Sequence, residues 1–253
     1  MEIYPPEKKL QLFEDFKSCD QHKILMEYVS NPLLVNGSKV DFRTYMLVAS
    51  LQPKLVFLYN EAVFRKSDKM YDLHSQDYNA HIMNSRNQTI TGHFLNYGYM
   101  KQIFSGQYDF GPNYIEKVLK PYLRKAHQFL FESEMFQFRR KNYVSSLGRF
   151  HIFALDWIID GKGKIFLLEG NRFPSLIAYP KQARVCTSLW SETSQLIRLI
   201  HTAPWAFPGD KPMLVKNEFA FGGWELIYNE LEAKYDELFF NKTYNPCTAF
   251  ESS

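Results

Sequence analysis

Two apolar runs joined by a short polar turn constrain the fold of this 253-residue chain more than any other feature. Residues 150–159 and 164–169 have the composition of strands, and the turn between them reads Asp-Gly-Lys-Gly, a strong hairpin signal. A two-residue loop at Gly161 and Lys162 predicts the register. In that register Asp156 lies opposite Leu167, and Glu169 lies opposite Ala154. The chain is therefore expected to build at least one antiparallel hairpin.

This register places three polar side chains on one side of the hairpin, because directly opposed residues share a face. They are Asp156, Glu169 and Asn171. Two carboxylates held this close repel each other unless a cation lies between them, and such hard oxygen ligands suit magnesium. A register slip of one residue would divide them between the two faces. In the alternative interpretation, Asp156 is a structural hydrogen-bonding residue and Glu169 a solvent-facing strand end.

A second strand with clean alternation is predicted at residues 39–49, with Lys39, Asp41 and Arg43 on one face. Val40 and Phe42 begin the apolar face opposite, which continues through Met46 and Val48. Without further context, such a charged face is also typical of a solvated row of salt bridges. Further strands are predicted at 24–29, 55–59 and 62–65, helices at 113–136, 182–201 and 224–240, and site-covering loops at 66–112.

Composition places the chain among ordinary globular proteins, because 45% of its residues are hydrophobic and 23% are charged. A net charge of +3 gives no general argument for nucleic-acid binding. The longest apolar stretch, 150–159, is interrupted by His151 and Asp156, so no membrane span and no membrane partner are expected. The three cysteines lie far apart, which favours reduced thiols and a cytoplasmic protein.

Several motifs, taken together and in order, resemble the tubulin tyrosine ligase-like family, whose members have an ATP-grasp fold. Residues 153–161 and 165–176 resemble the C-terminal signature of that family. Upstream, residues 27–34 are similar to its nucleotide hinge and the following Asn-Pro-Leu-Leu turn, and residues 37–48 to its Lys-Phe-Asp-Ile-Arg strand. Residues 58–65 and 81–84 follow in the family order, so the resemblance runs from about 24 to 178.

The resemblance implies a role for each matching residue. Asp156, Glu169 and Asn171 would bind Mg²⁺, and Arg43 would face the acceptor carboxylate. ATP would be contacted by Tyr28 at the hinge, Lys39 near phosphate, Asp41 near ribose, and Ile82 and Met83. The catalytic residues would be Arg65, His81 and Asn84, with Asn84 nearest the reacting group.

The expected fold is α+β, the C-terminal portion of an ATP-grasp fold, with an antiparallel sheet and helices packed on one face. Residues 1–22 are expected to form a polar N-terminal segment, 23–203 the catalytic portion, and 204–253 a helical extension and tail. The implied activity is ATP-dependent ligation of an amino acid, with glutamate favoured, to a glutamate of a tubulin tail through an acyl phosphate. Tubulin and a free amino acid are the implied partners, and the implied locations are the cytoplasm, the microtubule cytoskeleton and the cilium.

The sequence departs from the family pattern at three places. The hinge carries Met26 and Glu27, and Ile82-Met83 stands where the family has Leu-Thr. The 27 residues before Tyr28 contain no glycine, so no glycine-rich phosphate loop is expected there and activity of the chain alone is left open. A fragment of a ligase, a non-catalytic tubulin-binding module and completion by another chain are the alternatives. The basic run 139–141 is either a helix end or a contact for acidic tails.

Overall fold

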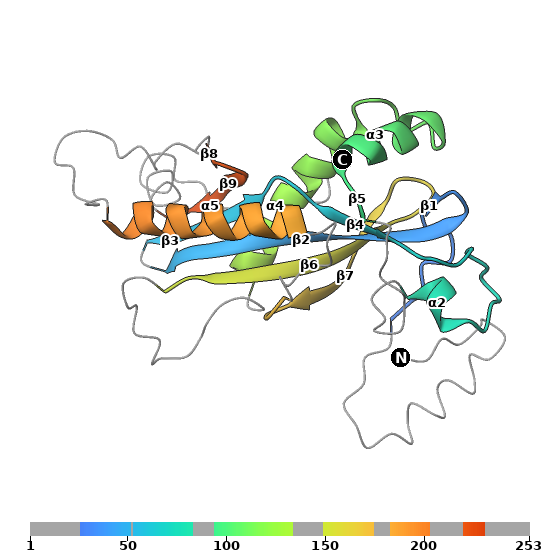
Figure 1. Cartoon of the computed structure of the whole chain (residues 1–253), viewed down its shortest axis with the longest axis horizontal. Helices are drawn as coiled ribbons and strands as arrows, with labels where there is room; N and C mark the ends of the chain where they lie inside the picture. Colours follow the sequence, from blue (N-terminus) through green and yellow to red (C-terminus); the bar gives the residue numbers. More distant parts are fainter. Residues whose placement is uncertain are drawn as a thin grey trace, which may run out of the picture.

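The computed structural model describes residues 26–51, 53–82, 94–133, 149–174, 183–202 and 220–230. Within these ranges the chain forms one antiparallel sheet of nine strands together with helices, which confirms the expected α+β class (Figure 1). The strands are β1 (Leu34–Val35), β2 (Ser38–Leu51), β3 (Lys54–Tyr59), β4 (Val63–Lys66), β5 (Phe94–Leu95), β6 (His151–Ile159), β7 (Ile165–Asn171), β8 (Ala220–Phe221) and β9 (Trp224–Asn229).

The long strand β2 organises the sheet, because it is long enough to pair with several partners. Along one edge it pairs first with β4 and then with β3, and along the other edge it pairs with β6. β7 continues the sheet beyond β6, while β9 and β8 continue it beyond β3. β1 enters β2 through a tight turn at Asn36 and Gly37, whose φ angles of 51° and 76° suit the Asn-Gly pair of a type I′ hairpin.

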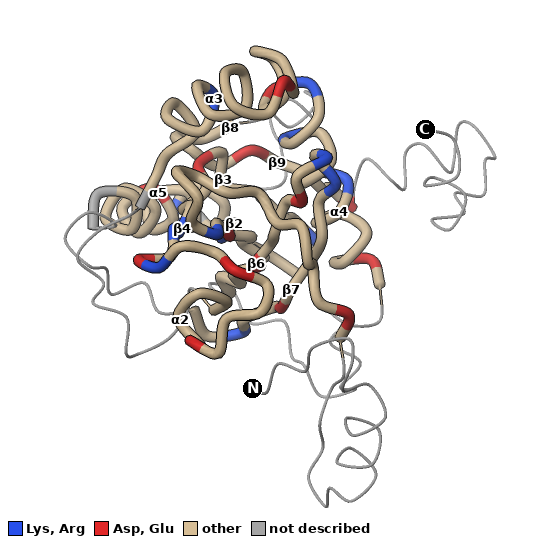
Figure 2. The backbone as a smooth tube through the Cα atoms, turned by 90° about the vertical axis from the view of Figure 1, so that its right-hand side faces the viewer, with Lys and Arg blue, Asp and Glu red and all other residues tan. Residues whose placement is uncertain are grey.

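Helices cover both faces of this sheet, whereas the sequence predicted helices on one face. One core lies beneath α3 (Tyr97–Gly106), the π-helical turn η2 (Ile115–Leu119) and α4 (Lys120–Glu132). The other core lies beneath α5 (Ala183–Thr202). Figure 2 shows α4 and α5 on opposite sides of the strands. Both faces need cover because β2 carries apolar side chains on each, Phe42 and Met46 on the α4 side and Tyr45 and Leu47 on the α5 side.

The helix predicted at 113–136 is present, but it has two parts within the described residues. Pro121 has no N–H to donate, and the five residues before α4 form the wider π-helical turn, closed by a bond from the Lys120 N–H to the Ile115 carbonyl. Helix α3 lies in the stretch predicted as loops. Asn96 caps its start by accepting a hydrogen bond from Tyr99 N, and Met100 and Phe104 bury one face.

Two sequence predictions for strands and helices are wrong where the structure describes them. Residues 26–29 form no strand, because an extended apolar run becomes a strand only where a neighbouring strand can pair with it. The helix predicted at 224–240 begins instead as strand β9, which pairs with β3 and buries Trp224, Leu226 and Ile227.

None of the described helices has the length and apolar character that a membrane span requires. A short helix, α2 (Tyr78–His81), follows β4.

Candidate functional site

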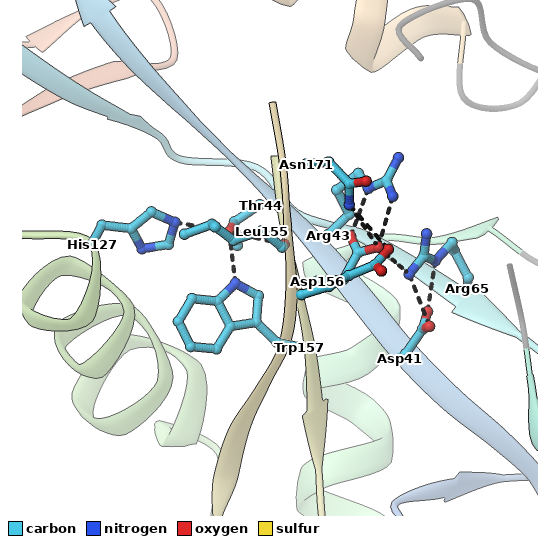
Figure 3. A network of polar contacts seen from close by, with 10 residues as sticks. Asp41, Arg43, Thr44, Arg65, His127, Leu155, Asp156, Trp157 and Asn171 are labelled. Atoms are coloured by element: carbon cyan, nitrogen blue, oxygen red, sulfur yellow. Dashed lines mark hydrogen bonds and ion pairs between the residues drawn. The ribbon is translucent and has the colours of Figure 1, made fainter. Parts of the chain in front are cut away.

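A cluster of buried charges lies on the α5 side of the sheet, where β4, β2 and β6 run side by side (Figure 3). Asp41 of β2 lies directly opposite Arg65 of β4, and Arg43 of β2 lies directly opposite Asp156 of β6. On the same face, β2 continues with Tyr45, which belongs to the core beneath α5. One face of β2 is therefore charged in its first half and apolar in its second.

The four charges form two forked ion pairs with a link between them. Arg43 donates from Nε and Nη2 to the two oxygens of Asp156, at 2.6 and 2.7 Å. Arg65 donates in the same way to Asp41, at 2.6 and 2.8 Å, and its Nη2 lies 3.2 Å from Asp156 Oδ2. All four side chains are buried or nearly so, which excludes the solvated row of salt bridges as the description of this face.

Burial and the arginines act on the two carboxylates in opposite directions. Burial raises the pKa of Asp156, but the hydrogen bonds and charges of Arg43 and Arg65 outweigh it and hold that pKa below its usual range. Burial also raises the pKa of Asp41, and there the Arg65 charge only reduces the rise. Of these two carboxylates, Asp156 is therefore the one that the cluster keeps ionised. An ionised buried carboxylate is a suitable first ligand for a cation.

The hairpin that carries Asp156 differs from the predicted register in two ways that compensate. Its loop has three residues rather than two, because Gly163 adopts a φ of +84° and Asp160 Oδ1 accepts hydrogen bonds from Lys162 N and Lys164 N. This longer loop alone would shift the pairing by one residue. Leu168 then forms a bulge between the Trp157–Leu167 and Asp156–Glu169 pairs, and the bulge restores the original facing.

The three predicted magnesium ligands consequently meet on one side of the hairpin. Asp156 and Glu169 are directly opposed, and Asn171 Nδ2 lies 3.4 Å from Asp156 Oδ2 and 3.1 Å from Glu169 Oε1. Glu169 is exposed while Asp156 is only 2% exposed, so the site opens toward solvent at Glu169. Within the described residues, no group of three His, Cys, Asp or Glu side chains could hold a metal ion. The potential ligands at this site are two carboxylates and one amide. That set fits a hard cation such as Mg²⁺.

A second polar cluster joins the start of β2 to α2 and to the predicted hinge. Lys39 Nζ donates to Tyr28 Oη at 3.0 Å and to the His81 carbonyl at 2.9 Å, and it lies over the Tyr28 ring. His81 Nε2 donates to the Ser75 carbonyl, which can only accept, and its Nδ1 is hydrogen-bonded to Tyr28 Oη at 2.8 Å. Burial lowers the pKa of Lys39 to about 8, against the opposing charge of Asp41.

The structure thus divides the predicted site residues between two clusters. Asp41, Arg43, Arg65, Asp156, Glu169 and Asn171 belong to the first, and Tyr28, Lys39 and His81 to the second. The described contacts of His81 are with Tyr28, Lys39, Tyr71 and Ser75 and not with the carboxylates. Ile82 directly follows His81 and caps α2 with its N–H. Met83, Asn84 and the basic run 139–141 lie outside the described residues.

The sequence analysis did not identify two hydrogen-bond partners, Ser75 and His127, that bind His81 and the strand β2. Ser75, whose carbonyl binds His81, lies in a stretch with no periodic pattern. His127, in contrast, gave a usable signal, because it follows Leu123 by four residues on the apolar stripe of its helix. A polar residue on such a stripe implies a buried hydrogen bond, and His127 bonds Thr44 on β2.

Comparison with known proteins gives one family and a set of distant relatives. The profile of the tubulin-tyrosine ligase family matches residues 6–203, extending beyond the 24–178 expected from the motifs. The chain is 27% identical over 170 residues to the human inactive polyglycylase TTLL10, covering 62% of the chain and 24% of that protein. It is 27% identical over 214 residues to mouse tubulin polyglutamylase TTLL5, covering 74% and 15%.

Mouse probable tubulin polyglutamylase TTLL9 is 28% identical over 232 residues, covering 85% of the chain and 46% of that protein. The chain therefore spans about a quarter or less of the first two relatives and under half of the third.

Proposed function

Since the chain belongs to the tubulin-tyrosine ligase family, we propose that it carries part of the site of an ATP-dependent ligase that joins an amino acid to a glutamate of a tubulin tail. The supporting observation is that Asp156, Glu169 and Asn171 meet on one side of the hairpin despite a changed loop and a bulge. The tubulin polyglutamylases among the relatives support glutamate as the added amino acid and tubulin as the acceptor. We propose that the protein acts on microtubules in the cytoplasm or the cilium.

In the proposed reaction the acceptor carboxylate takes the terminal phosphoryl group of ATP and releases ADP. The amine of the incoming amino acid then attacks the resulting acyl phosphate, and inorganic phosphate leaves. Both steps gather negative charge, so cationic side chains fixed near the reacting groups favour them. Arg43 and Arg65 are fixed in this way by their carboxylates. We propose that Arg43 faces the acceptor and that Arg65 faces the transferred phosphoryl group.

The residues that would hold a magnesium ion are Asp156, Glu169 and Asn171. When bound, Mg²⁺ would neutralise phosphate charge on the nucleotide. Glu169 offers the accessible carboxylate, whereas both oxygens of Asp156 already accept from arginines. Asn171 points its amide nitrogen at the two carboxylates, so it holds them together and would turn its oxygen toward a cation.

The second cluster suits nucleotide binding at the predicted hinge. Lys39 joins the backbone of α2 to Tyr28, so three chain segments are held by one cation. We propose that Lys39 contacts phosphate and Asp41 ribose, with Tyr28, Ile82 and Met83 along the nucleotide and His81 and Asn84 toward the reacting groups. The roles of all these residues stay predictions.

Substitution of Glu169 by Gln tests the proposal. The amide keeps the shape and the contact with Asn171 but loses the charge that attracts a hard cation. We expect Mg²⁺-dependent ATP affinity to fall by roughly tenfold or more, while thermal stability stays unchanged or rises because the carboxylate repulsion is relieved. Calorimetric titration with ATP at several Mg²⁺ concentrations, beside thermal unfolding, measures both.

The matched control is Glu116→Gln, which removes an exposed carboxylate whose ion pair with Lys120 lies on η2 and α4. It should leave the nucleotide affinity unchanged. Equal ATP affinity in wild type and Glu169→Gln would assign the Asp156–Glu169 pair a structural role only.

A non-catalytic tubulin-binding module is the second candidate function, favoured by one specific observation. The relatives include a polyglycylase described as inactive, at the same 27% identity as a relative described as a tubulin polyglutamylase. Binding of Mg²⁺ and ATP separates the two, because a module that only binds tubulin needs neither. Binding of tubulin without any Mg²⁺-dependent nucleotide binding would favour the module.

A further inference from the structure

A buried hydrogen-bonded group lies on the face of the sheet opposite the charged cluster, and nothing in the proposed reaction uses it. It consists of Thr44 of β2, His127 of α4 and Trp157 of β6 (Figure 3). Thr44 Oγ1 lies 2.9 Å from His127 Nε2 and accepts from Trp157 Nε1 at 2.8 Å. The three side chains are almost completely buried, and the His127 and Trp157 rings pack at 5.4 Å between centroids.

The hydrogen bonds fix one arrangement of protons. His127 Nδ1 lies 2.6 Å from the Leu123 carbonyl, which can only accept, so Nδ1 carries the proton. Nε2 is then an acceptor, and the Thr44 hydroxyl donates to it rather than to the more distant Leu155 carbonyl at 3.4 Å. The neutral imidazole therefore uses both nitrogens, one on its own helix and one on the sheet. Burial supports the neutral form by lowering the pKa of His127 to about 4.

Each strand residue of this group is the neighbour of a charged residue on the other face. Thr44 follows Arg43 in β2, and Trp157 follows Asp156 in β6. Arg43 and Asp156 are directly opposed and carry the forked ion pair. The bulge of the hairpin also begins here, between the Asp156 and Trp157 pairs. Helix α4 therefore contacts the sheet, through His127, next to the point where the pairing of β6 with β7 is irregular.

Helix α4 is also bonded to β9, so its position relative to β2 does not depend on the His127–Thr44 bond alone. Arg124 Nη2 donates to the Leu226 carbonyl of β9 at 2.9 Å, and Gln128 donates to the Ile227 carbonyl. His127 lies between these two anchors on the same helix. A helix held at β9 and bonded to Thr44 limits how far β2 and β6 can shift relative to each other.

We propose that His127, through Thr44 and Trp157, is a positioning residue that sets the geometry of the Arg43–Asp156 pair from the opposite face of the sheet. The inference rests on the proposed function only in making that pair part of the ligand site. Loss of the Thr44 hydroxyl would loosen the pairing of β2 with β6 next to the bulge of the β6–β7 hairpin. The fork between Arg43 and Asp156 would then open more often, and the first magnesium ligand would be less well placed.

The test uses the isosteric change Thr44→Val and measures hydrogen exchange of the Arg43 Nε–H by NMR in the nucleotide-free protein. We expect exchange about tenfold faster than in wild type, because the ion pair protects this proton. Thr44→Ser, which keeps the hydroxyl, should restore slow exchange. His127→Gln, which keeps polar atoms but not the two-sided bonding of the ring, serves as the second variant and should also exchange faster.

Phe131→Leu is the control for a merely structural effect. Phe131 is buried on the same helix and packs against Tyr228 of β9. It should lower thermal stability without changing Arg43 exchange. Unchanged exchange in Thr44→Val, or an equal increase in Phe131→Leu, would overturn the inference.

Mg²⁺-dependent ATP affinity is the second readout, and we expect it to fall about tenfold in Thr44→Val and to be retained in Thr44→Ser. Wild-type protein that binds no ATP would contradict the proposed function alone, because Arg43 exchange reports on the inference without any nucleotide.

Discussion

Asp156 is held by two arginines while it lies beside Glu169 and Asn171, so one buried carboxylate serves the ion-pair cluster and the predicted cation site together. Its two neighbours in the site have different surroundings: Glu169 is exposed and Asn171 is partly buried. The two carboxylates should therefore respond differently when each is replaced by its amide.

Asp156→Asn should destabilise the protein by about 3–5 kcal/mol, because it leaves the buried guanidinium of Arg43 without its carboxylate and removes the second carboxylate contact of Arg65. Glu169→Gln, at an exposed position, should change the free energy of unfolding by less than about 0.5 kcal/mol. Urea unfolding of both variants measures the contrast.

Because the pKa of Asp156 is lowered in the folded state, the stabilisation that its ionised form provides is present at neutral pH and is lost as the pH falls through that lowered value. Similar losses in the two variants would argue against the buried pairing.

His127 gives the second prediction at this scale. Its pKa falls from an ordinary 6.5 to about 4 on folding, so the unfolded chain binds the extra proton between these values. Stability should therefore decrease as the pH is lowered from 6.5 toward 4, by about 3 kcal/mol in total from this group. His127→Gln cannot titrate, and carboxylates common to both proteins cancel in the comparison. The measurement is the difference in unfolding free energy between wild type and variant at several pH values. A constant difference across this range would contradict the assignment.

The β6–β7 hairpin shows what a sequence can and cannot predict about a single element. Alternation located both strands and the side that carries Asp156, Glu169 and Asn171, because strand side chains repeat every two residues. The loop type and the bulge were beyond prediction. Gly163 permits a left-handed residue but does not require it, and nothing in the apolar run 165–168 marks Leu168 as the bulged position. The predicted side of the hairpin was right because the three-residue loop and the Leu168 bulge each shift the pairing by one residue, and a total shift of two residues leaves every side chain on the same face.

Two single-residue deletions in β7 test this description of the hairpin. Removing Leu168 takes out the bulged residue, so Glu169 still faces Asp156 and Asn171 still lies two residues further along. Mg²⁺-dependent ATP affinity should stay within about threefold of wild type. Removing Gly170 makes Glu169 and Asn171 adjacent, which sends their side chains to opposite faces, and the affinity should fall by roughly tenfold or more. The same titration serves both proteins. Equal affinity in the two deletions would show that facing does not decide binding.

At the scale of the molecule, local patterns predicted strand pairs better than the layers around them. The alternation in β2 gave the charged face correctly, but nothing in the sequence said that apolar residues such as Tyr45 and Leu47 needed a helix of their own. The strand β9 was mistaken for a helix because Trp-Glu-Leu-Ile-Tyr suits either structure over so few residues, and only pairing with β3 decides it. Tertiary context also determines that His81 bonds Tyr28 and Ser75.

Strand β9 gives the last prediction, because it lies beyond the residues that match the family profile yet belongs to the same sheet. Trp224 is fully buried beneath α5, its Nε1 bonds Thr193 at 3.1 Å, and its ring packs on Tyr59. Trp224→Ala should therefore cost about 3–5 kcal/mol. Trp190→Ala, on an α5 position that is 44% exposed, is the matched control and should cost less than about 1 kcal/mol.

Urea unfolding followed by far-UV circular dichroism compares the two tryptophan variants with wild type. If residues 204–253 formed a helical extension, as the sequence predicts, and that extension folded independently of the sheet, Trp224→Ala would cost no more than Trp190→Ala. A cost several times larger at Trp224 would instead mean that β3, which reaches β2 on one edge and β9 on the other, transmits the loss of β9 to the strand that carries Asp41 and Arg43. In that case β9, which lies after the family match, unfolds together with the sheet that carries the charged cluster.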